Sequence, residues 1–152
     1  MTKRQVLLES ISALLIMLFL YASVSKFLDF KTFTSEMNNQ PFPNSWTPFM
    51  IWAIPLSEIA IALSLIFERT RLAGLYASFV FMIIFTIYAA AILLHLFSYV
   101  PCSCGGVIRK LTWKQHLVFN LFFVALATIG IILKRGNLFK TIITIKNKNS
   151  FV

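Results

Sequence analysis

The sequence has few charged residues, and acidic side chains are the scarcest among them. Only 12% of its 152 residues are charged, with 14 Lys and Arg against 5 Asp and Glu, while 59% are hydrophobic. Soluble domains carry about 25% charged residues, so this composition excludes an ordinary soluble globular domain. The mean hydropathy of +0.82 points the same way. We therefore expect a membrane protein whose main partner is the lipid bilayer.

A basic face interleaved with exposed aromatic residues is also missing. The net charge of +9 would suit nucleic acid, but the Lys and Arg residues lie at the two ends and between apolar runs. We expect no nucleic-acid partner, because orientation in a bilayer is a better use for these charges.

Four apolar runs are long enough to cross a hydrocarbon core of about 30 Å, which takes roughly 20 helical residues. They are Val6–Val24, Pro48–Phe67, Leu75–Phe97 and Leu117–Leu133. The runs are continuous, whereas the strands of membrane barrels alternate apolar and polar residues. The sequence therefore predicts an all-α, integral membrane four-helix bundle.

The basic residues set the expected orientation of this bundle. With the N-terminus inside, the outer loops carry five of the 14 Lys and Arg, and the inner segments carry the other nine: the outer five are Lys26, Lys31, Arg109, Lys110 and Lys114. This bias places both termini in the cytoplasm. We expect a bacterial inner-membrane protein in which the loop between the third and fourth spans faces the periplasm.

The chain has no repeats and no linker that would divide two domains. We expect one membrane domain over residues 1–135 and a basic cytoplasmic tail over residues 136–152. In the first outer loop, Asp29 is a suitable N-cap, and Phe30, Phe33 and Met37 share one helical face before "QPFPN" breaks the pattern. This segment predicts an outer helix that lies in the membrane interface.

Glu58 is an acidic residue inside an apolar run. Counting from Pro48 at about 1.5 Å per residue places Glu58 near the midplane of the bilayer. A charge there costs about 2.5–3.5 kcal/mol, so such residues usually have a partner or a function. Glu58 is either a hydrogen-bonded structural group or part of a proton path or ligand site.

Other polar residues collect at the outer ends of the predicted spans. Lys26 is near the end of the first span and His95 near the end of the third, while Trp113, His116 and Asn120 share one face at the start of the fourth. We expect these residues and the cysteine loop to form one outer layer. The alternative is that Lys26 extends to the interface and the two histidines are ordinary interfacial residues.

The only two cysteines, Cys102 and Cys104, are separated by one residue in "VPCSCGG". A disulfide in so small a ring is strained, and strained exposed disulfides are oxidising and labile. Nearby Arg109 and Lys110 favour the thiolate. A redox pair is thus favoured over a structural loop, and over a Cu(I) or Zn²⁺ site completed by His95 or His116.

Four segments together resemble the MauE (methylamine-utilisation) branch of the DoxX-like membrane proteins. They are "SKFLDFKTF", "PLSE", "PCSCGG" and "LTWKQHLVFNLFFVAL", spread over roughly residues 5–135. The resemblance implies a four-helix bundle similar in plan to membrane disulfide oxidoreductases of the DsbB and VKOR kind. It assigns Cys102 and Cys104 to a redox pair, Glu58 to an acidic position of the second helix and Asn120 to the asparagine that opens the fourth.

We therefore expect a membrane thiol–disulfide redox protein that supports disulfide formation or maturation of exported proteins. Cys102, Cys104, His116 and His95 are the predicted catalytic residues, and Glu58, Asn120, Trp113 and Lys26 the predicted cofactor-binding residues. No second cysteine pair exists to relay electrons, so the pair must exchange directly with a periplasmic thioredoxin-like protein or an exported client, and with a quinone or a second protein. The alternatives are a non-enzymatic assembly or anchoring subunit and a metal or solute permease.

Overall fold

The computed structural model describes residues 2–97 and 112–149, with side chains described up to residue 136. It contains α1 (Lys3–Leu28), α2 (Phe30–Asn38), the short 3-10 helix η1 (Asn44–Trp46), α3 (Thr47–Ile66), α4 (Arg71–Leu93) and α5 (Trp113–Asn149). Four helical stretches are long and apolar enough to cross a membrane: Lys3–Leu28, Asn44–Ile66, Arg71–Leu93 and Trp113–Gly136. The predicted all-α membrane fold is confirmed, and the chain is a multi-pass membrane protein.

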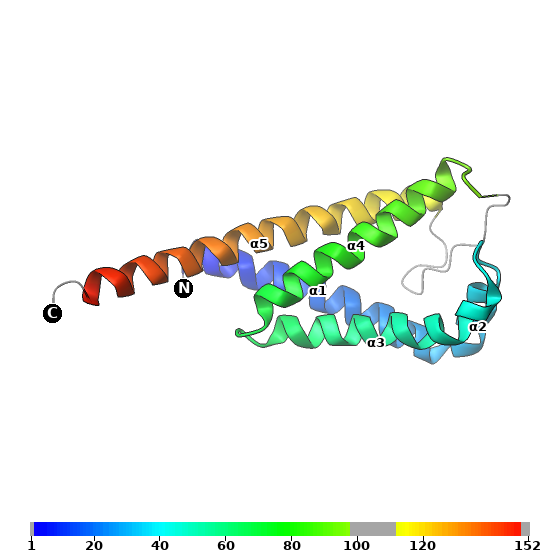
Figure 1. The fold of residues 1–152 in the computed structure, drawn as a ribbon, viewed down its shortest axis with the longest axis horizontal. Coiled ribbons are helices and arrows are strands. Elements are labelled where there is room, and N and C mark those ends of the chain that lie inside the picture. Colours follow the sequence, from blue (N-terminus) through cyan, green and yellow to red (C-terminus); the bar gives the residue numbers. More distant parts are fainter. Residues whose placement is uncertain (1, 98–111, 150–152) are drawn as a thin grey trace.

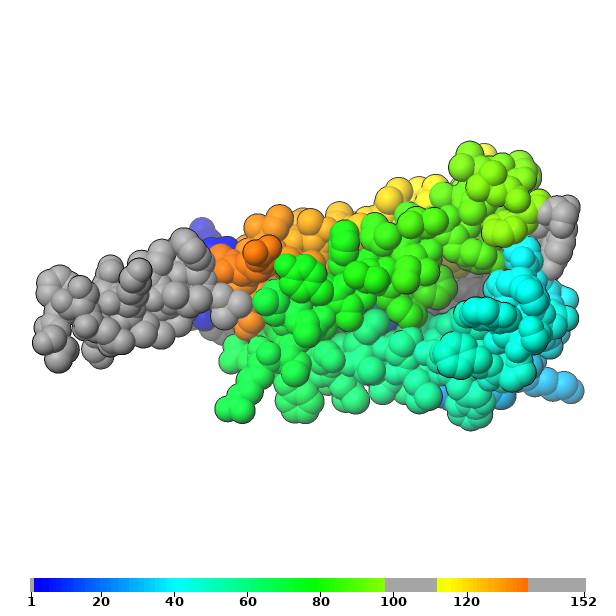
Figure 2. Space-filling model, viewed as in Figure 1, coloured from blue at the N-terminus to red at the C-terminus, as the bar shows by residue number. Residues whose placement is uncertain are grey.

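The four long helices form two pairs that diverge. Figure 1 shows α1 beside α3, and α4 beside α5, with the pairs close together near the N-terminus and apart at the end where α2 lies. The space-filling view in Figure 2 shows α3 and α4 in contact in the part of the bundle that lies away from α2. We call the open end the α2 end. The helix α5 continues beyond the bundle to Asn149.

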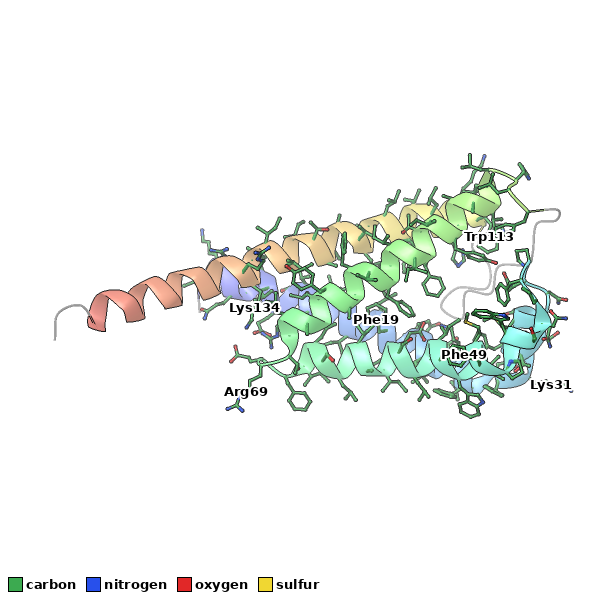
Figure 3. The ribbon with its side chains drawn as sticks, viewed as in Figure 1. Phe19, Lys31, Phe49, Arg69, Trp113 and Lys134 are labelled. Carbon is green, nitrogen blue, oxygen red and sulfur yellow. The ribbon has the colours of Figure 1, made fainter. Side chains whose placement is uncertain are left out.

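The core follows the helical period that the sequence carries. Buried side chains lie three or four residues apart along each helix: Leu8, Ile11, Leu15 and Phe19 on α1; Ile61 and Leu65 on α3; Phe123, Ala127 and Ile131 on α5. Figure 3 shows the side chains along the helices, including Phe19 within the bundle. Large apolar residues such as Met17, which is 68% exposed, cover the outside, as lipid-facing surfaces require.

Close contacts fix the end opposite α2. A Cβ atom on Gly74 would lie 3.0 Å from the backbone nitrogen of Leu65, so glycine lets α4 approach the backbone of α3. The guanidinium group of Arg71 donates to Glu9 Oε1 at 2.6 Å and to the Leu65 carbonyl oxygen at 3.2 Å. Arg71 thereby joins α1, α3 and α4 beside the short turn of residues 67–70.

The third predicted span extends four residues beyond the end of the observed helix. The helix α4 ends at Leu93 instead of Phe97, because His95 adopts the left-handed conformation with φ 52°. The backbone N–H of His95 donates to the Ile92 carbonyl and that of Leu96 to the Ala91 carbonyl, at 3.0 and 3.1 Å. These two bonds are those of a Schellman motif, in which the left-handed residue closes the helix.

The predicted outer helix is present as α2. Asp29 is its N-cap and accepts a hydrogen bond from the Thr32 backbone N–H at 3.3 Å, as predicted. On the predicted apolar face, Phe33 and Met37 are buried. Because α2 contacts α3, this face packs against the bundle.

Candidate functional site

The centre of the site is a buried ion pair between Lys26 of α1 and Glu58 of α3. Lys26 Nζ lies 2.7 Å from Glu58 Oε1, and the two side chains are only 7% and 5% exposed. Lys26 Nζ also donates to the Ala22 carbonyl oxygen at 3.3 Å. Two opposite charges out of water are stable only when they are paired and hydrogen-bonded in this way.

This contact corrects the predicted depths of the two residues. Counting along each helix places Lys26 in the outer layer and Glu58 at the midplane, yet the two side chains meet. The helix α1 ends at Leu28, only two residues after Lys26, whereas α3 begins at Thr47, eleven residues before Glu58. Because α3 reaches further toward the α2 end than α1 does, the two positions lie level. Lys26 is therefore not an interfacial residue that extends to solvent.

The environment of the pair leaves one oxygen atom unsatisfied. Ser23 Oγ donates to the Pro55 carbonyl oxygen at 3.1 Å, which ties α1 to α3 one helical turn away. The Phe33 ring lies 5.9 Å from Lys26 Nζ, within the range of a cation–π contact. Glu58 Oε2 is buried and has no hydrogen-bond partner in the described part of the chain. The carboxylate thus retains an acceptor that its neighbours do not use.

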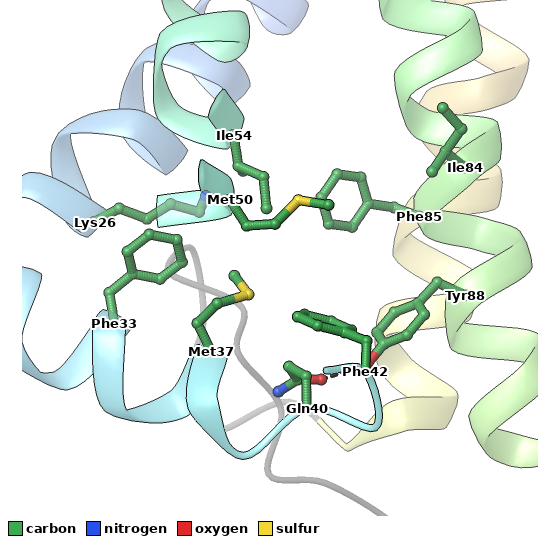
Figure 4. A pocket seen from close by; sticks show the side chains of 10 residues that line it. All are labelled: Lys26, Phe33, Met37, Gln40, Phe42, Met50, Ile54, Ile84, Phe85 and Tyr88. Carbon is green, nitrogen blue, oxygen red and sulfur yellow. Dashed lines mark hydrogen bonds between the residues drawn. The ribbon is translucent and has the colours of Figure 1, made fainter. Parts of the chain in front are cut away.

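A pocket of about 200 Å³ opens beside this pair between α2, α3 and α4. Figure 4 shows Lys26 on one side of it, and Gln40 and Tyr88 on the other. The other described residues of the lining are apolar: Phe33, Phe42 and Phe85, Met37 and Met50, and Ile54 and Ile84. The pocket combines aromatic and thioether walls with a polar group on either side.

Tyr88 connects this pocket to both flanks of the segment that carries the cysteines. Its hydroxyl group donates a hydrogen bond to Gln40 Oε1. The centre of its ring lies 6.1 Å from the ring centre of Phe97 and 6.1 Å from that of Trp113. Phe97 precedes residues 98–111 and Trp113 follows them, so one side chain contacts both flanks.

The start of α5 is fixed by a capping box. Thr112 Oγ1 accepts from the Gln115 backbone N–H at 3.4 Å, and Gln115 Oε1 accepts from the Thr112 backbone N–H at 2.9 Å. His116 is half-buried, with Nδ1 3.4 Å from the Thr112 carbonyl oxygen and its ring centre 6.0 Å from that of Trp113. Asn120 is buried one turn further along α5.

The predicted outer layer is therefore only partly assembled. The structure brings Lys26 to Glu58, and Trp113 to His116 and Tyr88. His95 is exposed and closes the end of α4, and it contributes nothing to the lining of the pocket. Trp113, His116 and Asn120 also lie outside that lining. Cys102 and Cys104 lie outside the described residues, and among residues 2–97 and 112–149 no group of three His, Cys, Asp or Glu side chains forms a metal-binding cluster.

The pocket itself is the part that the sequence interpretation missed. Met37, Met50 and Phe85 lie on three different helices, α2, α3 and α4, and no linear spacing relates them. The ion pair had only a partial signal in the sequence: Glu58 is a carboxylate within an apolar run and needs a partner, and Lys26 is a cation just beyond the end of another run.

Comparison with known proteins identifies the family of the chain. The family model described as "Methylamine utilisation protein MauE" matches residues 4–133, which include α1 to α4 and α5 up to Leu133. No curated protein and no solved structure matches the chain.

Proposed function

The chain belongs to the family of methylamine utilisation protein MauE, and from this premise we propose that it is a membrane thiol–disulfide redox protein. It supports disulfide formation or maturation of exported proteins through Cys102 and Cys104. The bundle lies in the bacterial inner membrane, with the cysteine segment on the periplasmic side. This orientation rests on the distribution of Lys and Arg.

The observation that carries the proposal is the position of the two residues that flank the cysteine segment. Residues 98–111 join Phe97 to Thr112 and include both cysteines of the chain. The flanking rings of Phe97 and Trp113 meet on Tyr88, which also lines the pocket at the α2 end. The two described flanks of the cysteine segment therefore meet at the same end of the bundle as the pocket and the buried ion pair, and this supports the proposal.

The proposed reaction is a two-step exchange. A thiolate of a periplasmic thioredoxin-like protein or an exported client attacks one sulfur atom of the Cys102–Cys104 disulfide, which breaks that bond and forms a mixed disulfide. A second thiolate of the partner attacks its own sulfur in the mixed disulfide. The partner leaves with a new disulfide, and the pair keeps two electrons and takes up two protons as a dithiol.

His116 is the histidine that is better placed to move a proton in this reaction. It lies beside Trp113, at the flank of the cysteine segment. A neutral imidazole can accept a thiol proton and return it. The imidazole of His95 is exposed at the end of α4, and the left-handed backbone of this residue closes that helix.

Trapping of mixed disulfides tests the proposal. Cys102→Ala and Cys104→Ala are each expressed in a cell that contains the partner proteins, with Ser103→Ala as the matched control. We expect one single-cysteine variant to accumulate a disulfide-linked adduct with a thioredoxin-like or exported protein, identified by mass spectrometry after non-reducing electrophoresis. The control, which retains both sulfur atoms, resolves the intermediate and accumulates none.

Absence of an adduct with both variants would contradict the exchange reaction. A permanently oxidised pair that no partner affects would instead favour the non-enzymatic assembly or anchoring subunit.

A further inference from the structure

We infer that the pocket between Lys26 and Tyr88 binds the ring of a membrane quinone, whose apolar tail lies in the groove between α3 and α4. The inference rests on the proposed thiol–disulfide function for its chemical purpose. The site is defined by the described residues alone. It differs from a quinone site among Trp113, His116 and Asn120, which the lining of the pocket does not include.

The proposed exchange reaction requires an electron acceptor. Re-forming the disulfide from the thiols of Cys102 and Cys104 makes one S–S bond and releases two electrons and two protons. The chain has no further cysteine to take the electrons. A quinone accepts both electrons, and each of its two carbonyl oxygen atoms takes one proton, which gives a quinol. The reaction is then balanced without another reductant or oxidant.

The size and walls of the pocket fit one flat ring. Its volume is about 200 Å³, and a cavity of about 150 Å³ is enough for benzene. Phe33, Phe85 and Tyr88 offer ring faces and edges, and the sulfur atoms of Met37 and Met50 make favourable contacts with aromatic rings. A substituted six-membered ring fills such a space without exposing polar atoms to the apolar walls.

The pocket has polar side chains on two sides, and Lys26 can bind a carbonyl oxygen atom of a quinone. Figure 4 shows Lys26 on one side of the pocket and the Gln40–Tyr88 pair on the other. An ammonium group has three N–H donors. Glu58 Oε1 and the Ala22 carbonyl accept two of them, which leaves one for a carbonyl oxygen of the ligand. A lipid acyl chain has no oxygen atom to accept this N–H of Lys26, and a charged donor that faces hydrocarbon costs free energy.

A second cavity lies next to the first and suits an apolar tail. It has a volume of about 340 Å³, lies between α3 and α4, and shares Ile84 with the ring pocket. The small side chains of Ala60, Ser64 and Ala77 form much of its lining. The groove lies along two apolar membrane spans, where an isoprenoid chain is soluble. A ring pocket with an apolar groove beside it fits a ligand with a polar ring and a hydrocarbon tail.

Equilibrium binding to the full chain in phosphatidylcholine nanodiscs tests the site, with tritiated decylubiquinone as the probe. Ile84→Trp fills the junction of the two cavities. Ile87→Trp is the matched control, because Ile87 is similarly exposed on α4 (63% against 57%) and lines neither cavity. We expect saturable binding of one probe per chain, weakened about tenfold or more by Ile84→Trp and unchanged by Ile87→Trp. Gln40→Leu, a smaller change at one polar side, also weakens binding.

Three outcomes would overturn the inference: no saturable binding, equal affinities of the two tryptophan variants when both are folded by circular dichroism, or displacement of the probe by decanol as readily as by unlabelled quinone. The last would identify the pocket as a site for an acyl chain. The measurement is repeated on the Cys102→Ala/Cys104→Ala chain, which we expect to bind the probe with unchanged affinity. Binding that persists without trapped adducts would contradict the proposed function alone, and trapped adducts without binding would contradict the quinone site alone.

Discussion

At the scale of the residue, Lys26 and Glu58 stabilise the bundle only as a pair. Each charge is buried between α1 and α3, and the 2.7 Å contact is what compensates for the loss of water around both. Removal of one partner leaves the other as an unpaired charge in an apolar environment. The effect of these two charges on the free energy of unfolding is therefore a property of the pair and cannot be assigned to either residue alone.

Lys26→Met and Glu58→Leu test this dependence. We expect each single variant to lower the free energy of unfolding by about 3–5 kcal/mol, because a buried pair that loses one partner costs that much. The double variant loses less than the sum of the two, since two apolar side chains leave no uncompensated charge. Unfolding in a mild detergent, followed by circular dichroism, measures all three.

Lys31→Met is the control for loss of a positive charge, because Lys31 is exposed on α2, and it leaves stability unchanged. Additive losses in the double variant would show that the two side chains act independently.

The kinds of residue in the site could be predicted from the sequence, but their contacts could not. Glu58 is a carboxylate within an apolar run, and this pattern predicts a residue with a buried partner or a function. Its partner depends on how far α3 extends beyond α1, and that offset is a property of packing. For the same reason, Gln40 and Met37 could not be assigned to a pocket with Phe85, which lies on another helix.

At the scale of the element, the end of α4 depends on the backbone of one residue. Leu94, Leu96 and Phe97 continue the apolar character of the helix, so hydrophobicity gives no stop signal before Phe97. The helix nevertheless ends at Leu93, because His95 takes a left-handed conformation that glycine usually supplies. The start of α5 did have a readable signal, the Thr112 and Gln115 capping box.

Substitutions at His95 separate a backbone role from an imidazole role. We expect His95→Gly to keep or raise stability, because glycine adopts a positive φ without strain. His95→Val, with a branched Cβ, lowers the free energy of unfolding by about 1–2 kcal/mol. Thermal unfolding in detergent compares the two variants.

Formation of the trapped adduct supplies a second measurement for this position. His95→Gly is introduced into the single-cysteine variant that traps a partner, and the amount of adduct stays the same when the imidazole takes no part in exchange. Loss of the adduct in a folded His95→Gly chain would assign proton transfer to His95 after all.

At the scale of the whole molecule, the two helix pairs are held together at one end and separated at the other. Gly74 and the short turn of residues 67–70 hold α3 against α4 at the end opposite α2. At the α2 end, the bulky side chains of Phe42, Phe85 and Tyr88 stand between the pairs and line the pocket. The four spans follow from local hydrophobicity, but this divergence is set by side-chain volumes summed over several helices, which no local pattern reveals.

The same arrangement brings the candidate functional groups to one end of the bundle. The ion pair, the pocket and both flanks of the cysteine segment lie toward the α2 end, as Figure 1 shows for the helices that carry them. The proposed periplasmic orientation exposes that end to exported proteins, while the groove between α3 and α4 remains accessible from the bilayer. In the proposed reaction, one end of the protein serves both a water-soluble thiol partner and a lipid-soluble electron acceptor.

The most direct test of the proposed function is the redox state of Cys102 and Cys104 in intact cells. A membrane-impermeant phosphine reduces exposed disulfides, and a membrane-impermeant maleimide polymer then adds a mass tag to each free thiol. The chain has only two cysteines, so the number of tags reports the state of the pair. We expect no tags before reduction, two after it, and none again once the phosphine is washed out and respiring cells re-oxidise the pair. Tags that appear only after the membrane is permeabilised, or a pair that stays in one state throughout, would contradict a periplasmic exchange site.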